Sequence, residues 1–385
     1  MLKIKIGILK RFTVNSLLYW ISKMIPKDEN IWVFGAWFGK KYADNSKYLF
    51  EYINEFHPQI RTIWLTDNDE VIKQLESRGN EVYKKYSLKA IMIGFKAKYS
   101  IFVHSNESDC MSFLNNGAKL IQLWHGIPLK KIGNDDLLKF NTKKYLNLKN
   151  LIFPFSIEHN YLCISASEED KSKFMTAFNS KRVVISGYPR NDTFYSSKSF
   201  NNKQFTITYL PTFRDNLDDK IDLFSDFGFQ IEKWNETLKN LDIKLNVKMH
   251  PVNKPKDSLL KNYSEYKCIN FLNEIDVADV LPNTDILITD YSSVFFDYLL
   301  TNKPIIFAPF DYEKYITKDR KLYYDYNKTT PGPKCKNWDE VLEWVIKFKE
   351  NQELFKEERI VIKNRFHTFQ DGNSCERVYN EIIKK

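Results

Sequence analysis

Short runs of apolar residues, each followed by polar or turn-forming residues, recur along the chain of 385 residues. In the first half, six runs have the length of buried strands: 31–35, 62–65, 99–103, 120–123, 161–164 and 183–185. Segments with helical spacing separate several of them, for example 69–79. Strands that alternate with helices indicate a parallel sheet with crossover helices.

The same alternation begins again in the second half. It predicts strands at 206–210, 245–249, 286–289 and 305–307, and helices near 227–240, 294–300 and 339–349. A stretch rich in Ser, Asn and Lys, 187–204, lies between the two series. We therefore predict an α/β protein with two doubly wound, Rossmann-like domains, 28–190 and 191–385. A last helix near 375–384 is expected to pack back on the first domain.

The N-terminal segment 1–27 has a different pattern. It is basic, and the first acidic residue of the chain is Asp28. Leu17, Trp20, Ile21 and Met24 fall at helical spacings, as do Ile4, Ile8 and Phe12. The longest uncharged stretch, 12–22, is far shorter than the ~20 residues that cross a bilayer. We predict a basic amphipathic helix that lies on an anionic membrane surface. An ordinary amphipathic helix packed on the protein core is the alternative.

Composition narrows the class of partner. The formal net charge of +9 fits nucleic acid, an anionic membrane or an anionic substrate. The chain has no run of five Lys or Arg and no nucleic-acid-binding fingerprint, so a nucleic-acid partner is not expected. The five cysteines form no C-x-x-C pair, which indicates buried thiols in the reducing cytoplasm rather than disulfides or a zinc site.

The candidate chemistry follows the predicted strands, because parallel sheets bind ligands at the carboxyl ends of their strands. His125 follows the run 120–123 in an irregular loop, where an imidazole can act as a general base. Lys130 and Lys131 lie farther along this loop and could bind negative charge on the acceptor or phosphate side. A hydrogen-bonded structural histidine is the alternative for His125.

The second half offers similar residues after its strands. His250 follows 245–249, and Arg214, whose planar fork suits phosphate oxygens, follows 206–210. Asp290, Ser292 and Ser293 follow 286–289 at a predicted helix start, which favours phosphate binding over plain helix capping. Which histidine removes a proton and which binds phosphate stays open at this point.

Several common chemistries lack their motifs. The chain has no P-loop, no G-x-G-x-x-G fingerprint and no G-x-S-x-G nucleophile elbow. No paired-Asp metal signature follows a strand, so the sequence predicts no cofactor and gives no support for a divalent metal ion.

Five segments, 124–133, 187–192, 248–251, 289–297 and 371–377, resemble the motifs of the CDP-glycerol glycerophosphotransferases of teichoic acid and capsule synthesis. The resemblance implies a GT-B arrangement, with the two domains facing across a cleft. It also implies transfer of glycerol phosphate from CDP-glycerol to a polyprenyl-linked glycan acceptor, with release of CMP, by a peripheral enzyme on the cytoplasmic membrane face.

The resemblance also implies residue roles. His125 matches the proposed base, and five positions match residues associated with donor phosphate or glycerol: His250, Arg214, Ser292, Ser293 and Asp371. Ile127 departs from the family pattern, in which Thr is frequent.

Three rival functions remain at the level of the sequence. One is a CDP-ribitol or other CDP-polyol phosphotransferase, the second is a nucleotide-sugar glycosyltransferase on the same fold, and the third is a membrane scaffold without catalysis. The acceptor, the oligomeric state and the number of units transferred stay open.

Overall fold

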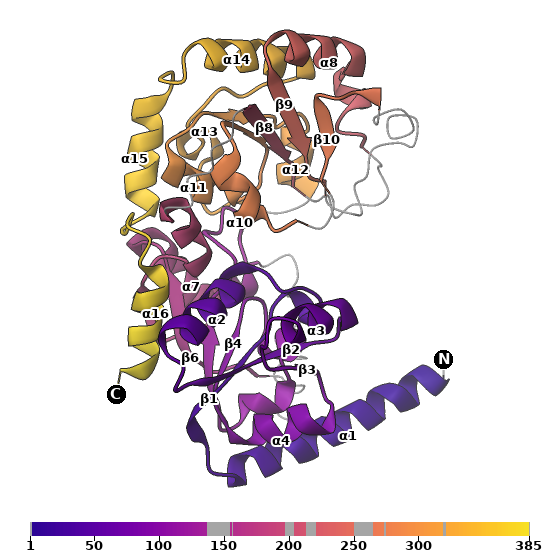
Figure 1. The fold of residues 1–385 in the computed structure, drawn as a ribbon, viewed down its shortest axis with the longest axis vertical. Coiled ribbons are helices and arrows are strands. Elements are labelled where there is room, and N and C mark those ends of the chain that lie inside the picture. Colours follow the sequence, from indigo (N-terminus) through magenta and orange to yellow (C-terminus); the bar gives the residue numbers. More distant parts are fainter. Residues whose placement is uncertain are drawn as a thin grey trace. The chain divides into compact units, whose positions relative to one another are not determined.

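Two separate parallel sheets organise the chain in the computed structural model, and each belongs to its own folded unit (Figure 1). The first unit comprises Met1–His125, Gly133–Asp192 and Asp371–Lys385, and the second comprises Gly126–Ile132 and Thr193–Gln370. The structure describes residues 2–136, 155, 157–196, 204–212, 221–249, 265–272, 275–318 and 321–384.

The sheet of the first unit has the order β3-β2-β1-β4-β5-β6-β7, with every neighbouring pair parallel. Its strands are β1 Asp28–Phe34, β2 Arg61–Thr66, β3 Val82–Lys84, β4 Ala97–Phe102, β5 Lys119–Gln122, β6 Asn160–Ser165 and β7 Val183–Ile185. The strand order reverses between β1 and β4. In doubly wound sheets, ligands bind beside such a switch point, at the carboxyl ends of the strands.

Helices connect these strands. They are α1 Leu2–Met24, α2 Asp44–Phe56, α3 Asp69–Glu76, α4 Leu88–Lys96, α5 Asn106–Asp109, α7 Glu168–Ala177 and α16 Ser374–Ile383. Side-chain caps fix the starts of two of them. Asn68 accepts a hydrogen bond from Glu70 N before α3, and Ser87 accepts one from Ala90 N before α4. Such caps satisfy backbone donors that have no partner inside the helix.

The C-terminal helix α16 belongs to the first unit and is anchored there at both ends. The partly buried carboxylate of Asp192 accepts hydrogen bonds from Ser374 N at 2.9 Å and Cys375 N at 2.8 Å. Farther along, Tyr379 stacks on His57 with ring centroids 3.6 Å apart. The chain therefore returns to the first unit after the second one is complete.

The second unit contains a smaller parallel sheet with the order β10-β9-β8-β11-β12. Its strands are β8 Phe205–Leu210, β9 Ile243–Val247, β10 Ile269–Phe271, β11 Ile286–Thr289 and β12 Ile305–Phe307. Its helices are α8 Ile231–Asn240, α10 Val277–Val280, α11 Val294–Tyr298, α12 Tyr312–Lys318, α13 Tyr326–Thr329, α14 Trp338–Glu350 and α15 Lys356–Phe366. The switch point of this sheet lies between β8 and β11.

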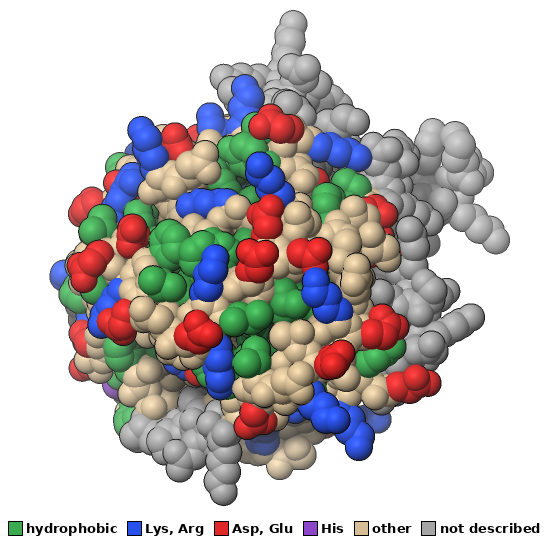
Figure 2. All heavy atoms as spheres, turned by 90° about the horizontal axis from the view of Figure 1, so that it is seen from above, with side chains coloured by type: hydrophobic (Ala, Val, Ile, Leu, Met, Phe, Trp, Pro, Cys, Tyr) green, Lys and Arg blue, Asp and Glu red, His purple; other side chains and the backbone are tan. Residues whose placement is uncertain are grey.

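Trp338 lies at the centre of the core of the second unit. Its ring stacks on Phe224 at 5.4 Å and contacts Tyr209 edge-on at 4.9 Å. Its indole N–H donates to Leu223 O at 2.7 Å, so the polar atom of this buried side chain is satisfied. Above this core, the outer face near α8 and α14 carries interspersed charges of both signs (Figure 2), among them the pair Lys233–Asp339.

The segment Gly126–Ile132, directly after His125, belongs to the second unit. Lys130 forms an antiparallel bridge with Leu322, flanked by hydrogen bonds from Lys131 N to Lys321 O and from Tyr323 N to Leu129 O, both 2.9 Å. The sequence places this segment within the domain 28–190, because a short bridge between distant loops has no periodic signal.

In the described part of the N-terminal helix α1, Leu18 and Tyr19 pack against the core of the first unit, and other apolar side chains are exposed. Asn15 and Ser22 are buried, whereas Val14, Leu17, Trp20 and Met24 are 52%, 62%, 55% and 75% exposed. The neighbouring helix α4 adds two more exposed apolar side chains, Leu88 and Met92. No helix in the described part of the chain combines the length and the apolar character that a membrane-spanning segment needs.

The ten predicted strands all occur, and two short ones, β3 and β10, are additional. Both lie at sheet edges and have three residues each, which is too short for a periodic pattern. The predicted helix 227–240 begins only at Ile231, because Gly228 adopts a left-handed conformation with φ of 79° and interrupts it.

We expect Trp338→Ala to lower the free energy of unfolding of the second unit by about 3–5 kcal/mol, because it removes a fully buried aromatic ring and leaves a cavity. Urea unfolding, followed by circular dichroism, measures this loss. Lys233→Ala is the control, since it breaks an exposed ion pair of the same unit and should cost less than about 1 kcal/mol. Equal losses in the two variants would contradict the described core.

Candidate active site

His125 lies just after β5, in a loop whose backbone is held in an unusual conformation. Trp124 has a φ of 52°, a left-handed value that is rare for a side chain of this size. Two hydrogen bonds involving Gln122 hold the loop: Trp124 N donates to Gln122 Oε1, and Gln122 Nε2 donates to His104 O, both at 2.9 Å. His125 is therefore held at the carboxyl end of the sheet rather than in a free loop.

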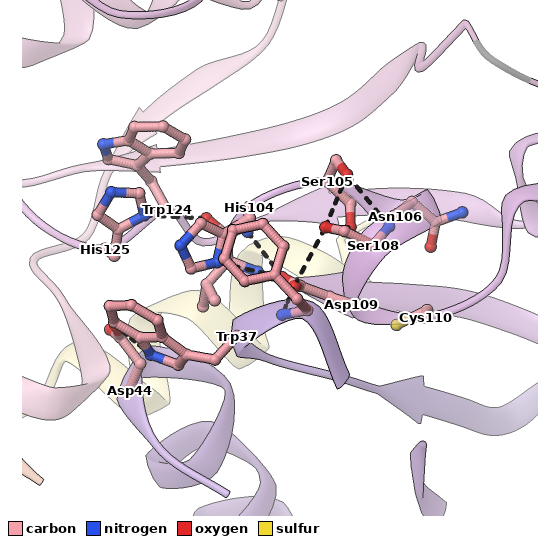
Figure 3. A network of polar contacts seen from close by, with 12 residues as sticks. Trp37, Asp44, His104, Ser105, Asn106, Ser108, Asp109, Cys110, Trp124 and His125 are labelled. Carbon is pink, nitrogen blue, oxygen red and sulfur yellow. Dashed lines mark hydrogen bonds and ion pairs between the residues drawn. The ribbon is translucent and has the colours of Figure 1, made fainter. Parts of the chain in front are cut away.

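Aromatic rings surround the His125 imidazole (Figure 3). Its ring centroid is 3.9 Å from Trp124, 4.6 Å from His104 and 6.2 Å from Trp37. The His125 Nδ1 atom lies 3.3 Å from the carbonyl oxygen of Val103 at the end of β4. Residues from the ends of three neighbouring strands, β1, β4 and β5, thus meet at the switch point of the first sheet.

A buried carboxylate, Asp109, joins the loops after β1 and β4. It accepts hydrogen bonds from Phe38 N at 2.8 Å, Val103 N at 2.9 Å and His104 N at 2.7 Å. The carboxylate is fully buried, and these donors, together with His104, hold its pKa below the ordinary value against the opposing effect of burial. Asp109 therefore carries a negative charge close to the His125 cluster.

A second set of contacts holds the His125 loop from the side of α2. Asn45 donates to Trp124 O at 2.9 Å and accepts from Arg190 N at 3.1 Å. The Arg190 guanidinium donates to Asp44 at 2.9 Å, and Asp44 also accepts from the Trp37 indole at 3.2 Å. The segment 187–192 thus takes part in the site of the first unit instead of acting as a simple linker.

Backbone strain gathers around this cluster. Trp37, Phe38, Asp44 and Trp124 all have positive φ values, between 49° and 65°. Each such conformation costs on the order of 1–3 kcal/mol in a residue other than glycine, and it persists only where the surroundings enforce it. This concentration of strain beside His125 marks the cluster as a candidate functional site.

Burial lowers the pKa of His125 well below that of a free imidazole, and the nearby His104 and Arg190 lower it further. At neutral pH the ring is therefore uncharged. If Nδ1–H donates to Val103 O, the other ring nitrogen, Nε2, has a lone pair that can accept a proton. A neutral imidazole of this kind is suited to general-base chemistry.

In the second unit, Asp290 lies at the switch point between β8 and β11. Its carboxylate is buried and accepts hydrogen bonds from Thr212 N at 2.8 Å and Tyr291 N at 2.6 Å. The sequence suggested helix capping or direct phosphate contact for this residue. The structure shows that it ties the ends of two strands together, as Asp109 does in the first unit.

Ser292 and Ser293 are partly buried at the start of α11, which has only five residues. Ser292 Oγ accepts a hydrogen bond from Val294 N at 3.4 Å. Behind them, Tyr291 stacks on Tyr315 with centroids 3.9 Å apart, and the Tyr315 hydroxyl accepts a hydrogen bond from Lys130 Nζ at 2.9 Å. Lys130 therefore lies in the second unit, near the β11 loop, although the sequence suggested the acceptor side.

The sequence also predicts Asp371, Arg214 and His250 as site residues. Asp371 belongs to the first unit, where it pairs with Arg377 at the start of α16; that pairing lowers the pKa of the Asp371 carboxyl. Arg214 and His250 lie outside the residues that the structure describes. Among the described residues, no group of three His, Cys, Asp or Glu side chains could hold a metal ion.

Trp37, His104 and Asp109 were not predicted as site residues, whereas Arg190 lies within the segment 187–192 that carries the family resemblance. A signal for His104 was present, because it follows the predicted strand 99–103 as directly as His125 follows 120–123. No sequence signal points to Asp109, because its contacts depend on the short helix α5, at whose end it lies.

Comparison with known proteins identifies similar chains. A family model described as CDP-glycerol:poly(glycerophosphate) glycerophosphotransferase matches residues 17–384. Relatives include a teichoic acid poly(glycerol phosphate) polymerase of Bacillus spizizenii, 29% identical with 96% of each chain covered. They also include a teichoic acid glycerol-phosphate transferase of Staphylococcus aureus, 28% identical with 96% of this chain and 98% of that protein covered.

Among solved structures, the wall teichoic acid polymerase TagF superposes with a TM-score of 0.78. The sequences are 24% identical, and the match covers 98% of this chain and 96% of that chain. This likeness shows a shared α/β fold with parallel sheets.

We expect Asn45→Ala to destabilise the first unit by about 1–3 kcal/mol, because it leaves the carbonyl of Trp124 and the N–H of Arg190 without their present partner. Thermal and urea unfolding measure the change. Asn54→Ala is the matched control, because Asn54 is a partly buried residue of the same helix that bonds Asn80 and Thr62 away from the His125 loop. A smaller loss in Asn45→Ala than in the control would count against the loop anchor.

Proposed function

Because the chain belongs to the CDP-glycerol:poly(glycerophosphate) glycerophosphotransferase family, we propose that it moves glycerol phosphate from CDP-glycerol to a polyprenyl-diphosphate-linked acceptor and releases CMP. The single observation that carries the proposed mechanism is the environment of His125. This imidazole is kept neutral at a strand end, with one nitrogen directed at a carbonyl and the other available to accept a proton.

In the proposed reaction, His125 Nε2 takes the proton from an acceptor hydroxyl, and the oxygen of that hydroxyl attacks the β-phosphorus of CDP-glycerol. The bond between that phosphorus and the oxygen bridging to the cytidine-bearing phosphate breaks, and CMP leaves with the bonding electron pair. The proton then passes from His125 to solvent. As in other phosphoryl transfers, most of the catalytic effect comes from positioning and charge stabilisation.

The donor diphosphate is proposed to bind in the second unit. Ser292 and Ser293 offer hydroxyl donors after β11, and Lys130 brings a positive charge to the same group of residues through Tyr315. Arg214 and His250 are proposed as further donor contacts, on the basis of their sequence positions after strands. This assigns Lys130 to the donor instead of the acceptor, a change that follows from its place in the second unit.

We also propose that α1 holds the enzyme on the cytoplasmic face of the membrane. α1 packs Leu18 and Tyr19 on the core of the first unit, yet it also exposes four apolar side chains on its other side, Val14, Leu17, Trp20 and Met24. With Leu88 and Met92 of α4, these side chains form an apolar surface that an acyl-chain boundary would cover. Lysines such as Lys23, which is exposed next to Trp20, suit anionic headgroups.

The reaction is tested with purified enzyme, CDP-glycerol and a lipid-linked acceptor, with CMP and the extended lipid detected by mass spectrometry. We expect His125→Ala to reduce the rate of CMP release by about 10²–10⁴-fold, the usual contribution of a positioned base, without loss of folding or CDP-glycerol binding. Parallel reactions with CDP-ribitol and UDP-sugars separate the rival donors. Near-normal turnover in His125→Ala would refute its role as base.

Membrane binding is tested by sedimentation with vesicles of phosphatidylglycerol and phosphatidylcholine. We expect the double variant Leu17→Glu, Trp20→Glu to bind at least about tenfold more weakly, because each lost apolar contact is worth on the order of 1.5–3 kcal/mol. The matched control is Phe56→Glu, Ile383→Glu, which changes two exposed apolar side chains of the first unit outside α1 and α4. Equal binding by the two double variants would contradict the proposed membrane surface.

A further inference from the structure

We propose that His104 and Asp109 are positioning residues for His125. Together they fix the orientation of the His125 ring and control whether it is charged when it takes part in proton transfer. The inference rests on the proposed role of His125 as the base, and it assigns a function to two residues that the sequence motifs leave out.

The first step concerns the ring orientation of His125. The Val103 carbonyl lies 3.3 Å from His125 Nδ1. A carbonyl oxygen only accepts hydrogen bonds, so it favours the tautomer with the proton on Nδ1 and the lone pair on Nε2. The catalytic state of His125 thus depends on where the end of β4 is held.

The second step concerns what holds the end of β4. Asp109 accepts hydrogen bonds from the N–H groups of Val103 and His104, the two residues that flank the peptide carrying this carbonyl. Its other oxygen accepts from Phe38 N in the loop after β1. Because the carboxylate is fully buried and bound from two loops, it acts as a rigid support directly behind the His125 contact.

The third step concerns charge. The His104 ring lies against that of His125 at a centroid distance of 4.6 Å and an interplanar angle of 24°. His104 Nδ1 is 3.7 Å from Asp109 Oδ2, an ion-pair distance rather than a hydrogen bond. Positive charge on the His104 ring opposes a proton on His125, whereas the negative charge of Asp109 favours one.

Among the described residues of the first unit, Arg190 is a further charged group that acts on His125. Arg190 lowers the pKa of His125, as a positive neighbour must, and its own charge is partly balanced by Asp44. Asp109 raises that pKa, while His104 lowers it. The two proposed residues therefore act on His125 in opposite directions, which gives them a signature that a purely structural role would not produce.

The experiment follows the titration of His125 by NMR in enzyme labelled with ¹³C at the histidine Cε1, with the His125 signal assigned by its loss in His125→Ala. We expect Asp109→Asn to shift the midpoint to lower pH and His104→Phe to shift it to higher pH, each by about half a pH unit or more. His104→Phe keeps the ring stack but cannot be charged. The acid limb of the kcat/KM profile for CMP release should move in the same directions.

Asp109→Asn should also reduce kcat by about 10²-fold, because one buried acceptor oxygen becomes a donor and the support of the Val103 carbonyl is displaced. The matched control is His57→Phe, which changes another stacked histidine of the same unit and should leave the His125 midpoint unchanged. Midpoints that coincide with the wild type in both variants, or that move in the same direction, would overturn the proposal. The NMR midpoint is read without substrate, so absence of CMP release by the wild type would refute the proposed reaction separately.

Discussion

A buried carboxylate at the switch point of each sheet is the interaction on which both candidate sites depend. Asp109 binds the loops after β1 and β4, and Asp290 binds those after β8 and β11. Where the strand order reverses, neighbouring crossovers leave in opposite directions and the backbone N–H groups at the strand ends lose their sheet partners. An acidic side chain placed there satisfies several of them at once. The same contacts fix the loops that bear His104 and Ser292.

The sequence predicted most of the architecture because apolar runs and turn residues are local signals. Every predicted strand is present, and the two that were missed are short edge strands. The rule that functional residues follow strands predicts His125, Asp290 and the two serines as site residues. The same rule leads from the strand 99–103 directly to His104.

The sequence could not predict contacts between chain segments that lie far apart along it. Asp109 reaches its partners through a four-residue helix, and Arg190 reaches Asp44 across 146 positions. The place of Lys130 in the second unit could not be predicted either, because its bridge to Leu322 leaves no periodic pattern in the sequence. In α1, the spacing of apolar residues predicted a helix, but spacing alone cannot tell which apolar residues face the protein. In the structure Leu18 and Tyr19 pack on the core, whereas Leu17 and Trp20 are exposed.

The chain passes between its two units four times: after His125, Ile132, Asp192 and Gln370. One consequence concerns proteolysis and dissection. A single cut near residue 192 would leave one fragment without α16, whose start is bound by Asp192, and the other without the segment that pairs with Leu322. The halves of this enzyme are therefore interdependent as polypeptides, and a gene split at the obvious boundary would yield two incomplete proteins.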